Sequence, residues 1–183
     1  MNTIFNIKTE ADFQAACLET FHYQYENVEV YRKFVDYLKI DLSKIKDIKD
    51  VPFLPIEMFK NHQVLDVNST TENYFQSSGT TQIQTRSKHY IADFSLYEES
   101  IYRSFEKFIG KPEDYIFLGL LPNYSENTHS SLIYMVDFLM KKSGKPENGY
   151  FLYNHQELFQ LLQKLGKENK KVILFGVSFA LLD

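Results

Sequence analysis

The stretch Tyr115-Ile116-Phe117-Leu118-Gly119-Leu120-Leu121 decides the fold of this 183-residue chain. The run is almost continuously apolar, which is typical of a strand that a parallel sheet buries on both faces. Helical patterns and further strands then alternate over short links, at residues 130–142 (helix), 149–153 (strand), 156–165 (helix) and 171–177 (strand). This alternation predicts an α/β fold with a parallel, doubly wound sheet and right-handed crossovers.

Two amphipathic helices are predicted ahead of the α/β part. The first begins at the N-cap Thr9 with Asp12 in its first turn, and the second covers about residues 28–38. Apolar side chains recur every four residues along the first helix, at Phe13, Cys17, Phe21 and Tyr25. A Lys- and Asp-rich link ends this region. We therefore divide the chain into an N-terminal helical segment, residues 1–50, and an α/β domain, residues 51–183.

A small β segment is expected at the start of the α/β domain. Its short strands are predicted at residues 63–67, 74–76 and 88–91. A helix capped by Asp93 follows, and its apolar set is Leu96, Ile101, Phe105, Phe108 and Ile109. Gly110 and Pro112 are expected to end that helix.

The loop Ser77-Ser78-Gly79-Thr80-Thr81 lies between two of the predicted strands. Its hydroxyls and backbone N–H groups can turn toward one anion, and Gly79 permits a close approach that a Cβ would obstruct. The Walker pattern GxxxxGK[ST] is absent. A surface turn explains the same composition, so an anion-binding loop and a simple turn both remain open on composition alone.

Four further stretches stand in consistent order with this loop. They are Val51-Pro52-Phe53-Leu54-Pro55-Ile56 with Phe59-Lys60, Leu120-Leu121-Pro122-Asn123-Tyr124, Ser130-Ser131-Leu132-Ile133-Tyr134-Met135 and Phe175-Gly176-Val177-Ser178-Phe179-Ala180. Together they resemble the LuxE-type acyl-protein synthetase family of the adenylate-forming superfamily, from about residue 20 to the last residue. The resemblance implies an incomplete N-terminal adenylating domain, about the first half of the family's usual length.

The resemblance also implies a reaction. A carboxylic acid, expected to be a fatty acid, would be activated by ATP with Mg²⁺ to an acyl-adenylate, and the acyl group would pass to a protein thiol. Two alternatives stay open: a ligase whose acceptor is coenzyme A, and a non-catalytic binding remnant of the same fold. The order of the Pro-Asn-Tyr and Ser-Ser-Leu-Ile-Tyr-Met segments favours the protein acceptor.

Site residues follow from the resemblance position by position. Ser77, Ser78, Gly79, Thr80 and Thr81 would hold the ATP phosphates, with Thr80 and Thr81 as the catalytic donors. The superfamily loop continues with Gly, but this chain has Gln82 there, and the superfamily's lysine has no counterpart by position. Arg86 and Lys88 are the candidate substitutes, although a solvated basic loop explains them as well.

Two residues after the predicted strand 115–121 are expected to contact the substrate. Tyr124 matches an aromatic position that borders the acyl pocket in related synthetases, and His129 lies close by in the sequence. Packing at a strand end is the alternative role for Tyr124. Cys17 lies on an apolar helix stripe, where a free cysteine usually acts as a small buried hydrophobe, so we reject it as the nucleophile. No metal-ligand spacing is visible.

Charge and composition restrict the cellular location of the protein and the classes of partner that it can bind. A net charge of −4 argues against a nucleic-acid surface. No apolar run approaches the length of a membrane span, and Met1-Asn2-Thr3-Ile4-Phe5 lacks a signal-peptide pattern. We expect a cytoplasmic protein.

The C-terminus carries one more expectation. Ser178 looks like a helix N-cap, yet only five residues follow it. One turn is barely a helix nucleus, so we expect an incompletely covered edge that favours self-association, and a chain that is inactive alone.

Overall fold

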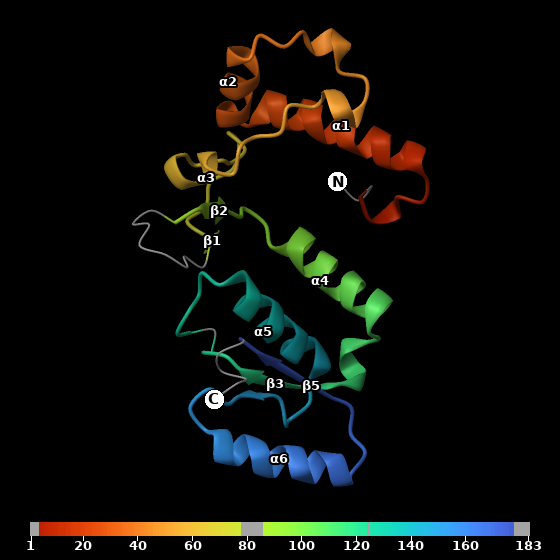
Figure 1. Cartoon of the computed structure of the whole chain (residues 1–183), viewed down its shortest axis with the longest axis vertical. Coiled ribbons are helices and arrows are strands. Elements are labelled where there is room, and N and C mark those ends of the chain that lie inside the picture. Colours follow the sequence, from red (N-terminus) through yellow and green to blue (C-terminus); the bar gives the residue numbers. More distant parts are fainter. Residues whose placement is uncertain (1–3, 78–85, 124, 178–183) are drawn as a thin grey trace. The chain divides into compact units, whose positions relative to one another are not determined.

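The computed structural model describes residues 4–77, 86–123 and 125–177, and it shows a mixed α/β chain (Figure 1). Contacts divide the chain into two compact units, residues 1–92 and 93–183. The division predicted after residue 50, into a helical segment and an α/β domain, stays a prediction.

Two helices open the first unit: α1 (Glu10–Asn27) and α2 (Glu29–Tyr37). The predicted cap of α1 is confirmed, because Thr9 Oγ1 accepts a hydrogen bond from Asp12 N at 3.1 Å while Asp12 Oδ2 accepts one from Thr9 N at 2.9 Å. This reciprocal pair satisfies two backbone donors that a helix start leaves unpaired. The core around the helices consists of Phe21, Val28, Tyr31, Val35 and Ile45.

The predicted apolar stripe of α1 is buried only in part. Phe21 is in the core, but Phe13 is 41% exposed and Cys17 is half-buried. Both of these side chains line a cavity instead of a packed interface. The four-residue spacing predicted the face correctly, because this face does turn toward apolar neighbours.

Short turns connect α2 to the small sheet: the 3₁₀ turns η2 (Leu42–Lys44) and η3 (Ile48–Asp50), and the helix α3 (Met58–Asn61). A further 3₁₀ turn, η1 (Ile4–Asn6), precedes α1. The strand predicted at 63–67 is wrong. Asn68 N donates to Asp66 Oδ1 at 2.7 Å, and this local turn competes with an extended ladder.

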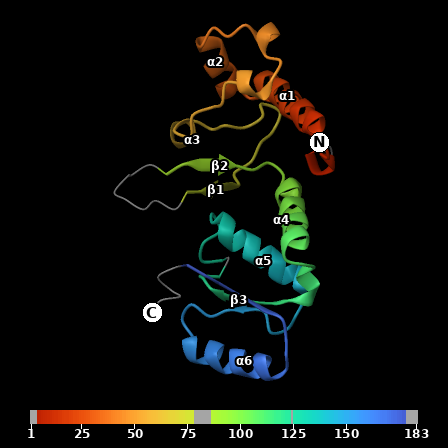
Figure 2. The same ribbon diagram turned by 45° about the vertical axis from the view of Figure 1, so that its right-hand side comes forward.

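A hairpin forms the small sheet of the first unit (Figure 2). Strands β1 (Tyr74–Gln76) and β2 (Lys88–Tyr90) pair antiparallel, with Phe75 opposite His89. Both predicted strands are therefore confirmed. The Ser/Thr loop connects strand to strand, as predicted, and its residues 78–85 lie outside the described part of the chain.

The second unit contains a three-stranded parallel sheet in the order β4-β3-β5. Its elements are α4 (Ser95–Phe108), η4 (Pro112–Asp114), β3 (Ile116–Leu120), α5 (Ser131–Ser143), β4 (Gly149–Tyr150), α6 (His155–Lys167) and β5 (Val172–Gly176). All five residues of β3 are buried, as the apolar run predicted. The start of α4 was predicted one residue too early: Asp93 accepts from Ser95 N at 2.8 Å, but Phe94 is the cap position.

Helices cover both faces of this sheet. Phe117 and Leu121 pack with α4 and α5, whereas Ile116, Leu118 and Leu120 pack with α6. The period of two along β3 thus sends alternate side chains to two cores. Helix α5 connects β3 to β4, and α6 crosses from β4 past β3 to β5 (Figure 1). The two crossovers run in opposite directions along the sheet. When both crossovers have the same handedness, their helices lie on opposite faces of the sheet.

Two polar side chains hold the entry of β3. Asn148 Oδ1 accepts from Phe117 N at 2.8 Å, and Ser143 Oγ donates to Tyr115 O at 2.6 Å. Gly144 ends α5 in the left-handed region at φ 62°, as its glycine predicted. These contacts fix the position at which β3 begins. They therefore also fix the position at which the loop after β3 starts.

Candidate functional site

The Ser/Thr loop leaves the hairpin at a closely tied base. Ser77 N donates to Ser87 O at 3.1 Å, and Ser87 N donates to Ser77 Oγ at 3.2 Å. Ser87 is only 4% exposed and Ser77 is exposed, so the second bond is shielded from water on one side only. The Ser77 hydroxyl is therefore already used as an acceptor within the hairpin, and it keeps its proton for one further partner.

Four predicted phosphate-binding residues lie outside the described part of the chain: Ser78, Gly79, Thr80 and Thr81. Their roles, including the catalytic role of Thr80 and Thr81, stay predictions. The structure does show the two positions that bracket them. Ser77 and Arg86 leave eight intervening residues to form the loop between the ends of one hairpin.

A cavity of about 330 Å³ opens at the base of this hairpin. Arg86 and Lys88, the predicted substitutes for the superfamily lysine, both line it. Lys60 and His62 add two more basic side chains to the same wall, with Gln63 and Gln76 as neutral polar neighbours. Among the described residues that line this cavity none is acidic, so the site has an excess of positive charge that attracts anions.

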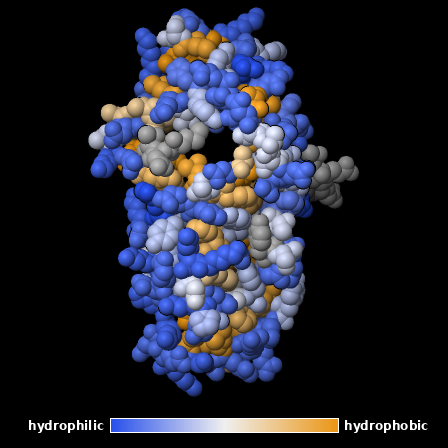
Figure 3. All heavy atoms as spheres, turned by 180° about the vertical axis from the view of Figure 1, so that it is seen from behind, coloured by the Kyte–Doolittle hydropathy of each residue, from blue (hydrophilic) through white to orange (hydrophobic). Residues whose placement is uncertain are grey.

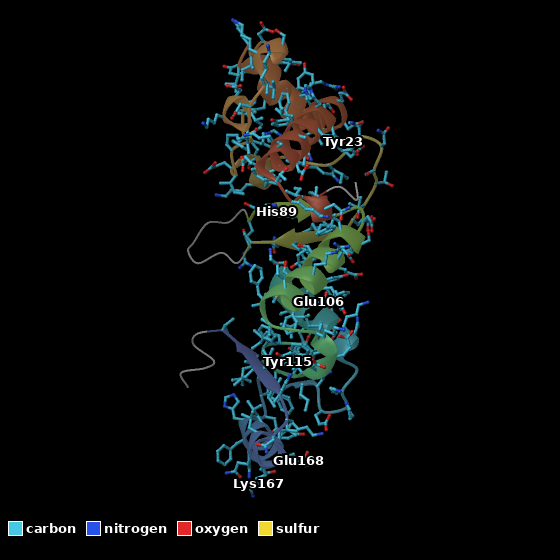
Figure 4. The ribbon with its side chains drawn as sticks, turned by 90° about the vertical axis from the view of Figure 1, so that its right-hand side faces the viewer. Tyr23, His89, Glu106, Tyr115, Lys167 and Glu168 are labelled. Carbon is cyan, nitrogen blue, oxygen red and sulfur yellow. The ribbon has the colours of Figure 1, made fainter. Side chains whose placement is uncertain are left out.

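Packing orients part of this cationic cavity. Lys88 Nζ lies 4.6 Å from the centroid of the Tyr74 ring, a cation–π contact across the hairpin. Phe59 from α3 stacks on His89 from β2, with ring centroids 4.6 Å apart (His89 is labelled in Figure 4). The α3 segment is thereby attached to the hairpin, which brings Lys60 next to Arg86 and Lys88.

Sequence reasoning missed Lys60 as a site residue. It appeared only as part of the Phe59-Lys60 pair within the family resemblance. The neighbouring Phe59 is the sequence feature that could have indicated Lys60. An aromatic side chain needs an aromatic or apolar partner, and His89 of the hairpin is that partner.

His129 belongs to the second unit, in the loop that follows β3. It is half-buried and comes directly before Ser130, whose Oγ accepts from Ile133 N at 3.3 Å and caps α5. Earlier in the loop, Asn123 Nδ2 donates to Glu126 Oε1 at 2.6 Å. Tyr124 lies outside the described residues. Substrate contact by Tyr124 and His129 therefore stays a prediction.

The carboxyl ends of β3 and β5 lie side by side, with Leu120 opposite Gly176. Loops that leave such neighbouring parallel strands form the crevice where α/β proteins hold ligands. The loop with Asn123 and His129 starts from this edge, as the sequence predicted from the position of Pro-Asn-Tyr.

Two tyrosines have strongly raised pKa values. Burial raises the pKa of Tyr31 to about 12, and its hydroxyl donates to Pro52 O at 2.8 Å. Burial, with a smaller effect of the Asp137 charge, raises the pKa of Tyr150 to about 12. Among the buried side chains of the described residues, the Tyr150 hydroxyl is the group without a hydrogen-bond partner. Both tyrosines stay neutral at physiological pH and act in packing.

In the described part of the chain, no cluster of three or more histidine, cysteine or acidic side chains is arranged to hold a metal ion. No described helix is long and apolar enough to cross a membrane.

The family comparison covers the first unit and the start of the second. The model of the family described as "Acyl-protein synthetase, LuxE" matches residues 6–108, more than half of the 183 residues. The chain belongs to this family. The matched range contains α1, the cationic cavity, the hairpin and all of α4. No curated protein and no solved structure matches the chain.

Proposed function

We propose that this LuxE-family chain contributes the phosphate-binding part of an acyl-protein synthetase. The enzyme would form an acyl-adenylate from a carboxylic acid, expected to be a fatty acid, and ATP, and would transfer the acyl group to a protein thiol. Family membership supports acyl-protein synthesis from an acid and an acyl-accepting protein. The observation that carries the phosphate-binding role is the cationic cavity at the base of the Ser/Thr loop.

The reaction has two balanced steps. In the first, a carboxylate oxygen forms a bond to the α-phosphorus of ATP, and the bond from that phosphorus to the pyrophosphate oxygen breaks. In the second, a thiolate forms a bond to the acyl carbon, the bond from that carbon to the AMP oxygen breaks, and the thiol proton passes to the medium. Negative charge grows on the leaving oxygen in each step.

The cationic cavity fits the first step. Fixed positive charges and N–H donors stabilise charge on transferring phosphoryl oxygens without having to reorganise during the reaction. Arg86, Lys88 and Lys60 line one cavity, and the loop Ser77–Thr81 begins at its edge. We assign Thr80 and Thr81 as hydroxyl and backbone donors to the phosphates, in agreement with their place in the motif.

Mg²⁺ is expected to accompany ATP as substrate. It binds mainly phosphate oxygens and water in such sites, so it needs few ligands from the protein. We assign no side chain of this chain as its ligand.

The second unit is proposed to belong to the adenylating domain. Its sheet would be the start of the doubly wound sheet of an adenylating domain in the adenylate-forming superfamily. Tyr124 and His129 follow β3 and are proposed to border the acid.

Calorimetric titration with pyrophosphate, and with ATP plus Mg²⁺, tests the phosphate role. Arg86→Gln and Lys88→Gln should each weaken binding roughly three- to tenfold, since both remove a charged donor at a partly exposed site. Lys49→Gln is the matched control: it removes the same charge in the same unit from an exposed position outside the cavity. Equal affinity in all three variants and the unchanged chain would contradict the phosphate site.

A further inference from the structure

A second cavity, of about 470 Å³, lies within the first unit. Its walls come from η1, α1, the segment between η3 and α3, and α3 itself. The lining is aromatic and aliphatic, and none of the described residues that form it is charged. Cys17 and Thr20 provide small polar groups on the α1 side.

Several apolar side chains of this cavity remain in contact with water. Phe53 is 71% exposed, and Ile4, Ile7 and Phe13 are also exposed. In the space-filling view, hydrophobic patches interrupt the hydrophilic surface of the first unit (Figure 3). A ligand that removes such apolar surface from water lowers the free energy of the system. The volume falls in the range of small-molecule sites, about 300–1,000 Å³.

The apolar cavity adjoins the cationic cavity. Phe59 is a lining residue of both cavities, so the two cavities meet at this residue. Its stacking on His89 holds the ring in place. An uncharged apolar space and a cavity lined by Lys60, Arg86 and Lys88 therefore meet at Phe59. This charge pattern complements an amphiphile with a hydrocarbon chain and an anionic head.

We propose that the apolar cavity binds the hydrocarbon chain of the carboxylic acid, with the carboxylate directed past Phe59 toward the cationic cavity. This assignment rests on the proposed function for the identity of the head group. Attack on phosphorus requires the reacting atoms to approach within about 3–3.5 Å. The carboxylate end of the acid must therefore reach the phosphate site, and the meeting of the two cavities at Phe59 allows this.

Cys17 is a built-in reporter for this site. It is the one cysteine of the sequence, it is half-buried, and it lines the apolar cavity. The rate at which a small neutral maleimide modifies the whole chain is measured in the presence of straight-chain carboxylates from butanoate to tetradecanoate, below their micelle concentrations. The concentration that halves this rate should fall roughly fourfold for each added CH₂, the increment expected for methylene burial, until the cavity is full.

Two adjacent alanines of α1 provide a matched pair. Ala16 lines the cavity, whereas Ala15 is exposed and does not. Ala16→Trp places an indole in the cavity and should weaken protection of Cys17 by the long carboxylates. Ala15→Trp adds the same bulk to the same helix and should leave protection unchanged. Thermal melting checks that both variants fold, and the chain-length series on the unchanged protein needs no variant.

The head group is tested by charge removal. Lys60→Gln should weaken protection by decanoate several-fold and leave protection by its methyl ester unchanged, because the ester carries no charge. Protection that is absent, or independent of chain length, overturns the proposal, as does equal protection in the Ala15 and Ala16 variants.

Pyrophosphate binding separates this inference from the proposed function. If pyrophosphate binds at Arg86 and Lys88 but no carboxylate protects Cys17, the hydrocarbon site is wrong and the phosphate site stands. If long carboxylates protect Cys17 but pyrophosphate does not bind, the hydrocarbon site stands and the phosphate assignment is wrong.

Discussion

Replacing Gly119 by alanine should destabilise the second unit, because a Cβ at this position has no room. Gly119 lies in the buried strand β3, and an ideal Cβ built on it would stand 2.9 Å from Tyr150 Cδ1 and 3.3 Å from Tyr150 Cε1. Ordinary van der Waals contacts begin at 3.4 Å, so the ring has to move by about half an ångström. Overpacking of this kind costs about 1–3 kcal/mol.

Two effects reduce that cost. Strand β4, which carries Tyr150, is an edge strand of two residues and can move outward. Alanine also restricts the unfolded chain and regains about 0.4–1 kcal/mol. We therefore expect Gly119→Ala to lower the free energy of unfolding by about 1 kcal/mol, near the low end of the overpacking range.

Gly166→Ala is the matched control. Gly166 lies near the end of α6, and nothing stands within 4 Å of an added Cβ there. The same substitution should raise the free energy of unfolding by about 0.4–1 kcal/mol. Urea unfolding followed by far-ultraviolet circular dichroism measures both variants. Equal stabilisation by the two alanines would refute the reasoning, because it would mean that Tyr150 does not pack on Gly119. In a Tyr150→Leu background the cost at Gly119 should shrink.

Three further predictions concern single side chains. Tyr150→Phe should stabilise the chain by about 1 kcal/mol in urea unfolding, because it removes a buried hydroxyl without a partner; a loss of stability would point to a bound water at that hydroxyl. The Tyr23 hydroxyl donates to Asp66, and this bond lowers the carboxyl pKa below its ordinary 3.8. Its stabilising effect is therefore present above that value and disappears as the pH falls through the folded-state pKa, so melting temperatures of Tyr23→Phe and the unchanged chain should differ at neutral pH and converge in acid. Thr80→Val or Thr81→Val, made in a protein that forms adenylate, should slow that step roughly ten- to a hundredfold with an almost unchanged melting temperature. A lowered melting temperature with normal adenylation per folded molecule would instead assign these hydroxyls to a turn.

Local sequence signals predicted those elements whose stability comes from their own residues. Thr9 and Asp12 cap α1 through hydrogen bonds within four residues of chain, and Gly144 ends α5 through its own left-handed backbone. The β3 run 115–121 was predicted as doubly buried because it is almost continuously apolar. At the two helix ends the deciding interaction is short in sequence, so the local pattern predicts it.

The predictions that failed depend on distant partners. Residues 63–67 have strand-like composition, but a strand needs a neighbour to pair with, and the turn at Asp66 and Asn68 forms instead. Phe13 lies on the face that its helical spacing predicted, and only the fold shows that this face borders a cavity.

For the site, the sequence by itself determined the chemistry of the loop: small residues, four hydroxyls and a glycine between two short strands, in an order that resembles one family. Only the tertiary structure decided which cations accompany it and what lies next to them. Lys60 is separated from Arg86 and Lys88 by more than two dozen residues of sequence, and it lies with them at one cavity because Phe59 of α3 stacks on His89 of the hairpin. Phe59 also belongs to the lining of both the charged cavity and the apolar one. No periodicity or motif encodes that adjacency, because it results from packing between segments whose partners are chosen only when the chain folds.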